Sequence, residues 1–208
     1  MAITMTPAAE RHVVKHLEHR AKGVGIRLGV RTTGCSGLSY VLEFVDDAAA
    51  EDEVFQCGDI KLIIDPKSLL YLDGTELDYV KEGLKLLTQS GIQSAVLTNK
   101  YGPHARAVCD YLGISTFLRF TIGANDTKWK KPNPELTRLA LDRIGYGSQE
   151  TIYVGDSPYD FNTAQNADLL CHLVATGTHS LDELSILQPL SVHSDFESLV
   201  RHLLNKSE

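Results

Sequence analysis

The chain has 208 residues, enough for one large domain or two small ones, and its composition, 43% hydrophobic and 23% charged, is typical of globular proteins. Acidic side chains outnumber Lys and Arg by 27 to 20, and neither half of the sequence has the basic excess of a nucleic-acid binder. No apolar run is long enough to cross a bilayer, and the first residues lack the pattern of an export signal. We therefore expect a cytoplasmic protein with reduced cysteines and neither nucleic-acid nor membrane partners.

The first part of the chain, residues 1–82, is predicted to form a small antiparallel α+β module. Thr6 followed by Pro7 is typical of a helix start, and apolar residues at four-residue spacing extend the helix to about residue 21. Alternating apolar and polar residues over 26–31 predict a half-buried strand, which returns over 38–45. The remaining predicted elements of this module are strands at 54–56, 61–64 and 76–80 and a helical turn from residue 66.

Over residues 83–208, strands alternate with helices, which predicts a parallel, Rossmann-like α/β sheet with right-handed crossovers. Polar residues gather where these strands end, the edge at which open α/β sheets bind ligands. The predicted strands lie at 95–97, 117–122, 151–154, 170–174 and near 192. The predicted helices lie at 81–90, 103–112, 134–144, 159–166, 180–187 and 195–204.

Cys35 lies in a glycine-rich turn, Gly34-Cys35-Ser36-Gly37, between two predicted strands. A core cysteine normally lies within an apolar run, whereas the small neighbours here leave the sulfur accessible. From chemistry alone, a bystander cysteine in a tight turn is the better interpretation.

Two further groups in this module could serve a metal. Cys57 lies at a predicted turn, where we interpret it as an incidental thiol, with an assisting ligand as the alternative. His12, His16 and His19 fall near one helical face, but no carboxylate partner accompanies them in the sequence. A solvated histidine face is therefore the preferred interpretation.

The strings GIRLGVRTTGCSGLSYVLEFV (25–45) and LDGTELDYVKEGL (72–84) resemble the A-type iron–sulfur carriers, the IscA family. The resemblance covers residues 1 to about 84, and it implies that Cys35 binds iron or an iron–sulfur cluster and that the module forms a homodimer. In that family the other ligands come from a Cys-x-Cys near the carboxyl terminus, and these 208 residues contain no Cys-x-Cys. Biological clusters usually take about four thiolates, so the module is expected to bind weakly.

Several polar residues follow predicted strands in the second part. Thr98 and Asn99 close one strand, and the hydroxyl and the following amides suit a phosphate oxygen. Lys131 precedes a helix and could neutralise a phosphoryl group. Asp156 and Asp160 place two carboxylates at another strand end, with spacing suited to Mg²⁺. Taken singly, these residues also fit a helix cap, a surface charge and a turn.

The strings LTNK (97–100), KPNP (131–134) and VGDSPYD (154–160), in this order, resemble the haloacid dehalogenase superfamily, nearest its phosphoglycolate-phosphatase-like branch. The resemblance implies a phosphatase acting on a phosphorylated small molecule. By the same resemblance, Thr98 and Lys131 bind phosphate, Asp156 ligates magnesium, and Asp160 supports it.

The motif that carries this family's nucleophile is absent. The family begins with a strand ending in Asp-x-Asp-x-Thr, which does not occur in this sequence. The nearest string is Tyr71-Leu72-Asp73-Gly74-Thr75, which keeps Asp73 as a candidate acid/base but has Tyr71 in place of the nucleophile. There is also no room for the family's cap domain between Thr75 and Thr98. By resemblance the lost strand is central in the sheet, so residues 60–65 or 69–73 would have to fill its place.

Three interpretations follow: a magnesium-dependent phosphohydrolase using a noncanonical motif at 71–75, a working iron–sulfur carrier, or a fused chain without the full activity of either module. We favour the third, because each module lacks part of its functional site.

Overall fold

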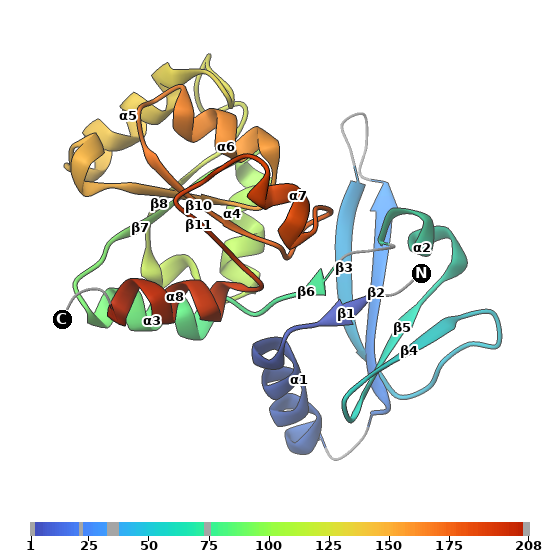
Figure 1. Ribbon diagram of the computed structural model, residues 1–208. Coiled ribbons are helices and arrows are strands. Elements are labelled where there is room, and N and C mark those ends of the chain that lie inside the picture. Colours follow the sequence, from blue (N-terminus) through green and yellow to red (C-terminus); the bar gives the residue numbers. More distant parts are fainter. Residues whose placement is uncertain (1–2, 21–22, 33–37, 73–75, 206–208) are drawn as a thin grey trace. The chain divides into compact units, whose positions relative to one another are not determined.

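A computed structural model describes most of the chain (Figure 1). The chain divides into two compact units, Met1–Tyr79 and Val80–Glu208, three residues before the expected boundary. The division precedes the helix that begins at Lys81, which packs within the second unit. None of the helices in the described ranges is both long and apolar enough to cross a membrane. The described residues are 3–20, 23–32, 38–72 and 76–205.

The first unit combines short strands with two helices. Thr6 caps the first helix as predicted, because its hydroxyl accepts a hydrogen bond from the Ala9 amide at 3.2 Å. Its elements are β1 (Thr4–Met5), α1 (Pro7–Arg20), β2 (Gly25–Thr32), β3 (Leu38–Val45), β4 (Glu53–Cys57), β5 (Ile60–Ile64), α2 (Pro66–Leu72) and β6 (Glu76–Leu77).

The main sheet of this unit has the order β3-β2-β5-β4. The β2–β3 and β4–β5 pairs are antiparallel, but β2 and β5 are parallel, from Gly25 opposite Lys61 to Arg27 opposite Ile63. The prediction of an antiparallel module is therefore wrong for the central pair. The physical reason is that residues 46–52 connect one edge strand, β3, to the other edge strand, β4. The β4–β5 hairpin therefore lies beside the β2–β3 hairpin, with its inner strand β5 parallel to β2.

The core of the first unit lies between the sheet and α1. Alternate residues of β5, Ile60, Leu62 and Ile64, are fully buried there with Ile26 of β2 and Val13 of α1. These three side chains of β5 share one face because side chains alternate along a strand, and Ile63 between them is also fully buried. A second small sheet joins β1 to β6 in parallel, and sequence periodicity did not predict β1 because it has only two residues.

The second unit alternates strands and helices as predicted. Its strands are β7 (Ser94–Leu97), β8 (Leu118–Ile122), β9 (Ile152–Gly155), β10 (Leu170–Val174) and β11 (Ser191–His193). Its helices are α3 (Lys81–Gln89), α4 (Gly102–Tyr111), α5 (Pro134–Ile144), α6 (Pro158–Gln165), α7 (Leu181–Ser185) and α8 (Phe196–Asn205), with 3-10 turns η2 (Ser115–Phe117) and η3 (Ser148–Glu150).

All strand pairs of this unit are parallel, but they form two sets, β7-β8 and β11-β10-β9. Within the described residues, no ladder joins β7 to β9, so the two sets of strands are not paired with each other. A cavity of about 380 Å³ is lined by all four residues of β7 and by Ile152, Tyr153 and Val154 of β9. Neither segment expected to fill such a gap pairs with β7 or β9: residues 60–64 form β5, which pairs within the first unit, and Leu69–Leu72 belong to α2.

Helices cover both faces of these strands (Figure 1). On one face, α3 packs on α8, and α8 packs on β10 and β11. On the other face, α5 packs on β7 and α6 packs on β9 and β10. The α3–α8 contact is close at Gly83, where an added Cβ would lie 2.7 Å from the ring of Phe196. The strands therefore lie between two helical layers, with their ends free for a site.

Candidate functional site

The predicted polar residues lie at the carboxyl ends of β7 and β9. Thr98 directly follows β7, and its hydroxyl accepts a hydrogen bond from the Lys100 amide at 3.1 Å. Asp156 directly follows β9. After β7, Asn99 bonds to the Lys131 backbone, and after β9, Asp156 bonds to Asp160, which contacts the Lys131 ammonium. The carboxyl ends of β7 and β9 therefore lie together, and the two strands run in the same direction. This is the edge at which a parallel sheet presents loop residues to a ligand.

Asn99 holds the backbone of Lys131 in place. The Asn99 carboxamide oxygen accepts from the Lys131 amide at 3.0 Å, and its nitrogen donates to the Lys131 carbonyl at 3.2 Å. The hydroxyl of Tyr159 also donates to that carbonyl. These contacts use both ends of the Asn99 side chain, so Asn99 positions the lysine and has little capacity left for a ligand.

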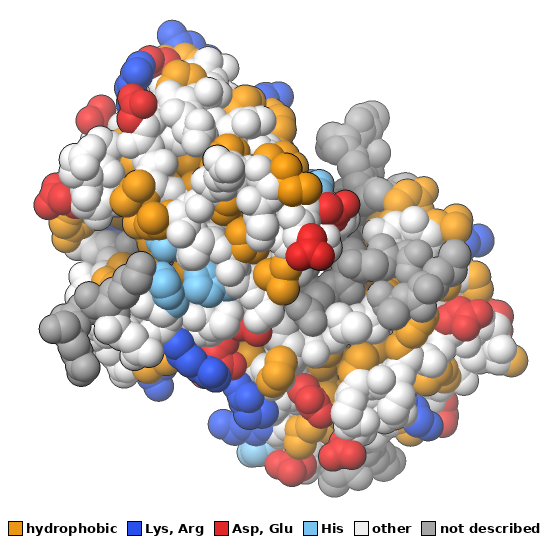
Figure 2. Space-filling model, viewed as in Figure 1, with side chains coloured by type: hydrophobic (Ala, Val, Ile, Leu, Met, Phe, Trp, Pro, Cys, Tyr) orange, Lys and Arg blue, Asp and Glu red, His pale blue; other side chains and the backbone are white. Residues whose placement is uncertain are grey.

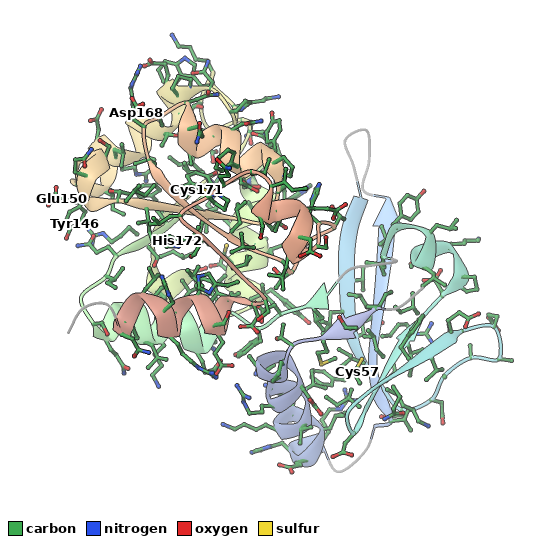
Figure 3. The ribbon with its side chains drawn as sticks, in the orientation of Figure 1. Cys57, Tyr146, Glu150, Asp168, Cys171 and His172 are labelled. Carbon is green, nitrogen blue, oxygen red and sulfur yellow. The ribbon has the colours of Figure 1, made fainter. Side chains whose placement is uncertain are left out.

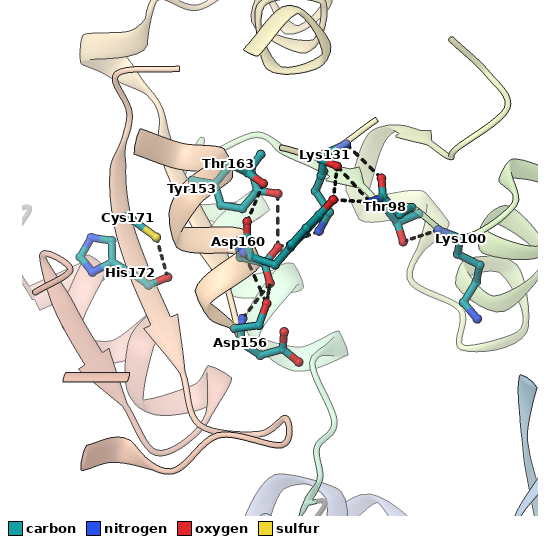
Figure 4. A network of polar contacts seen from close by, with 12 residues as sticks. Thr98, Lys100, Lys131, Tyr153, Asp156, Asp160, Thr163, Cys171 and His172 are labelled. Atoms are coloured by element: carbon teal, nitrogen blue, oxygen red, sulfur yellow. Dashed lines mark hydrogen bonds and ion pairs between the residues drawn. The ribbon is translucent and has the colours of Figure 1, made fainter. Parts of the chain in front are cut away.

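Asp160 is the centre of the polar network (Figure 4). Its carboxylate accepts from Lys131 Nζ at 2.7 Å, from the Ser157 hydroxyl at 2.7 Å and from the Asp156 amide at 3.3 Å. The Asp160 side chain is only 9% exposed and that of Lys131 14%. Asp160 lies in the first turn of α6, against Gly155, where an added Cβ would be 2.1 Å from the Asp160 Cβ.

The two carboxyls differ in their electrostatics. Burial, and then the charge of Asp160, raise the pKa of Asp156. Burial opposes ionisation of Asp160 too, but the hydrogen bond and charge of Lys131, with the Ser157 hydroxyl, hold the pKa of Asp160 below its ordinary value. Asp160 is therefore a fixed anion that neutralises Lys131, and Asp156 is the carboxyl that gains most from an added cation.

The structure brings together Asn99, Lys131, Asp156 and Asp160 as the sequence predicts, with Thr98 adjacent. Sequence reasoning missed Tyr159 and Ser157, although both lie in the quoted VGDSPYD string. It also missed Gly177, where an added Cβ would lie 2.5 Å from the Asp156 carboxylate. No pattern in the sequence indicated Gly177, because it approaches the site only through the fold.

Two predicted site residues, Cys35 and Asp73, lie outside the described residues. Tyr71, the neighbour of Asp73 in the candidate motif, is on α2 and is 57% exposed. Cys57 ends β4, and its sulfur donates to the Ile3 carbonyl at 3.9 Å (Figure 3). Burial, and then the Glu10 charge, raise the pKa of the Cys57 thiol.

The histidines of α1 are partly packed. The His12 ring stacks on Tyr79 with centroids 3.7 Å apart, and His16 lies 4.4 Å from His12. His16 and His19 are exposed, and the His19 Nδ1 lies 2.6 Å from the Lys15 carbonyl oxygen. The face is thus solvated at two positions, as expected, and packed on an aromatic ring at the third.

Comparison with known families finds two matches. The profile of the haloacid dehalogenase-like hydrolases matches residues 71–174, and that of iron–sulphur cluster biosynthesis proteins matches residues 1–99. The chain is 60% identical over 84 residues to the iron-binding protein IscA of Xenorhabdus nematophila and 61% identical to that of Serratia proteamaculans. Those 84 residues are 40% of this chain and 78% of each relative.

Solved structures resemble the second part. A haloacid dehalogenase superfamily hydrolase from Ehrlichia chaffeensis superposes with a TM-score of 0.52 at 25% identity, over 61% of this chain and 57% of the hydrolase. A predicted phosphoglycolate phosphatase from Haemophilus somnus, at 24% identity and a TM-score of 0.55, shares the fold over 60% of this chain and 55% of its own. The chain thus spans little more than half the length of these two hydrolases.

Proposed function

We propose that this chain, which belongs to the haloacid dehalogenase-like hydrolases and, through its first part, to the iron–sulfur cluster biosynthesis family, binds Mg²⁺ and a phosphate group in its second unit without hydrolysing phosphate monoesters. The observation that carries this proposal is that hydrogen bonds connect Lys131 and Asp156 to Asp160 near the carboxyl ends of β7 and β9. The sequence of the chain contains no Asp-x-Asp-x-Thr. The described part of the site has charge for a ligand, and the sequence lacks the motif that carries the family's attacking carboxylate.

The donor set fits Mg²⁺. Carboxylate oxygens are the ligands that this hard cation prefers. Burial and then the charge of Asp160 raise the pKa of Asp156, and a divalent cation would favour the ionised form of this carboxyl. We assign Asp156 as the ligand and Asp160 as the residue that positions it, because Asp160 already accepts hydrogen bonds from Lys131 and Ser157. When bound, the ion would neutralise charge on a phosphate.

The phosphate would be held by Lys131 and Thr98. The Lys131 ammonium has three donor hydrogens, of which Asp160 takes one, so it can still donate to phosphate oxygens. The Thr98 hydroxyl accepts from the Lys100 amide and keeps its own hydrogen to donate. Asn99 acts indirectly, by fixing the backbone of Lys131.

The missing nucleophile and the divided sheet have one explanation. We infer that the cavity between β7 and β9 is the place of a strand that this chain lacks, whose carboxyl end would reach the site beside Thr98 and Asp156. The support is the parallel direction of β7 and β9 and the lining of the cavity by both. Turnover is then lost, because removal of a catalytic nucleophile costs about 10⁴–10⁶ in rate.

The test separates binding from turnover. Calorimetric titration with inorganic phosphate in the presence of Mg²⁺ should detect binding that Asp156→Ala abolishes and that Asp142→Asn, an exposed carboxylate on α5, leaves unchanged. An aryl phosphate should not be hydrolysed by the parent chain or by Tyr71→Asp. Hydrolysis by the parent that Asp156→Ala abolishes would overturn the proposal and indicate a different nucleophile. Hydrolysis only by Tyr71→Asp would establish 71–75 as a disabled motif.

For the first unit, we propose weak binding of iron or a labile cluster through Cys35 in a homodimer. The support is the 60% identity to the iron-binding protein IscA and the absence of a Cys-x-Cys in this sequence. After anaerobic reconstitution, the small visible absorbance should disappear in Cys35→Ser and persist in Cys57→Ser. A stable, stoichiometric cluster in Cys35→Ser would contradict this assignment.

A further inference from the structure

Three histidines of the second unit converge from three different elements. His172 lies on β10, His193 ends β11, and His202 lies on α8, which packs on both strands. Val174 pairs with His193 in the parallel ladder, so His172 and His193 lie on adjacent strands, two residues apart in register. Figure 2 shows histidine side chains gathered on this unit, and Figure 3 labels His172. None of the three belongs to the site at Lys131.

The ring nitrogens are close enough for one ion. One nitrogen of each histidine lies within 4.8 Å of those of the other two. Nitrogen ligands at about 2.0–2.1 Å from a tetrahedral ion are separated by about 3.3 Å. A convergence of at most about 1.5 Å between any two nitrogens, within the reach of small χ rotations, is therefore sufficient.

Ser191 lies between two rings of the cluster. The Ser191 hydroxyl lies 2.6 Å from His172 Nδ1 and 2.6 Å from His193 Nε2. A hydroxyl has one hydrogen and two lone pairs, so Ser191 can donate to at most one of the two imidazoles. The neutral imidazole is the form that binds metals. A hydrogen bond to one ring nitrogen fixes the orientation of an imidazole, and ligand histidines are commonly oriented by such a bond.

His202 has a buried ring nitrogen whose hydrogen bonding a purely structural cluster leaves unsatisfied. Its Nε2 is buried and finds no hydrogen-bond partner within the described part of the chain. The His202 ring lies 4.9 Å from that of His193 and 5.9 Å from that of His172, by their centroids. A buried polar atom without a partner costs free energy, and a metal ion at the centre of the three rings would satisfy it.

We propose that His172, His193 and His202 form a binding site for a divalent transition-metal ion of the zinc type. Imidazole nitrogens suit Zn²⁺, Ni²⁺ and Cu²⁺ and not Mg²⁺, so this site is chemically distinct from the carboxylate site at Asp156. Three protein ligands leave a fourth position for water. The ion would tie α8 to β10 and β11.

The test uses the full chain, freed of metal by chelation, with Zn²⁺ as the probe. Amide hydrogen–deuterium exchange of the peptide that covers β11 and α8 is measured with and without Zn²⁺. We expect Zn²⁺ to slow this exchange in the parent and in His104→Asn, which removes an exposed histidine of α4, and Mg²⁺ to have no such effect. In His202→Asn the protection should disappear, and affinity in competition with a chelator should fall by at least about 10–100-fold.

His193→Gln serves as a second variant, and circular dichroism checks that both variants remain folded. Loss of the Zn²⁺ effect in both folded variants supports the site. A parent chain that Zn²⁺ does not protect, or protection that persists in both variants, overturns it.

Discussion

Asp160 and Lys131 are oppositely charged residues that are both largely removed from solvent. Each satisfies the other, so removal of one leaves a buried charge without compensation. We predict that Lys131→Met lowers the free energy of unfolding by about 3 kcal/mol, measured by urea denaturation of the full chain. Lys130→Met, at the exposed neighbouring lysine, should change it by less than about 0.5 kcal/mol.

The same pair offers a check by double substitution. Asp160→Asn in the Lys131→Met background removes the uncompensated charge, so part of the lost stability should return. A double variant no more stable than Lys131→Met would show that the lysine stabilises the unit by packing of its aliphatic stem and not through Asp160.

Cys57 yields a prediction about pH. Because its pKa is raised above the usual value of about 8.5, the thiol stays protonated through neutral pH, and the reactive thiolate appears only at higher pH. Alkylation of Cys57 by iodoacetamide, followed by mass spectrometry, should be slower at pH 8 than for an ordinary thiol. Glu10→Gln should accelerate it, because Glu10 contributes to the raised pKa, and Glu18→Gln, an exposed position on the same helix, should not.

At the scale of elements, the packing of α3 on α8 depends on a glycine. A β-branched side chain at Gly83 would meet the ring of Phe196, so Gly83→Val should lower the free energy of unfolding by about 1–3 kcal/mol. Gly147→Ala, where an added Cβ would have only the Glu150 carboxylate in contact at 3.6 Å, is the control. Equal stability of the two variants would mean that α8 shifts away at no cost.

Local elements were well predicted, and pairings between distant elements were not. Capping residues and periodicity predicted α5 and β10 to the residue and α1 to within one residue at each end, because those signals lie within each segment. The parallel pairing of β2 with β5 joins residues far apart in the sequence, and no local signal encodes it. For the site, the sequence singled out Lys131, Asp156 and Asp160 as candidates, and the structure joins Lys131 and Asp156 to Asp160 by hydrogen bonds. The cluster of His172, His193 and His202 was missed, because its members lie singly on three elements.

At the scale of the whole molecule, the chain consists of two units with separate cores. Units with separate cores usually unfold in separate steps, and the divided strands of the second unit should make its step the less cooperative one. We predict a broad or two-step transition by calorimetry, together with concentration-dependent association through the edges of β7 and β9. A single sharp two-state transition of a monomer would contradict this prediction.

The cavity between β7 and β9 also restricts what sequence could complement this chain in a split-protein assay. Because β7 and β9 run in the same direction, an added peptide would have to run parallel to both. Its side chains would point alternately toward the layer of α3 and α8 and the layer of α5 and α6, so neither face would meet water. A complementing peptide must therefore be apolar at every position along the strand, and an amphipathic peptide with alternating polar residues would be excluded.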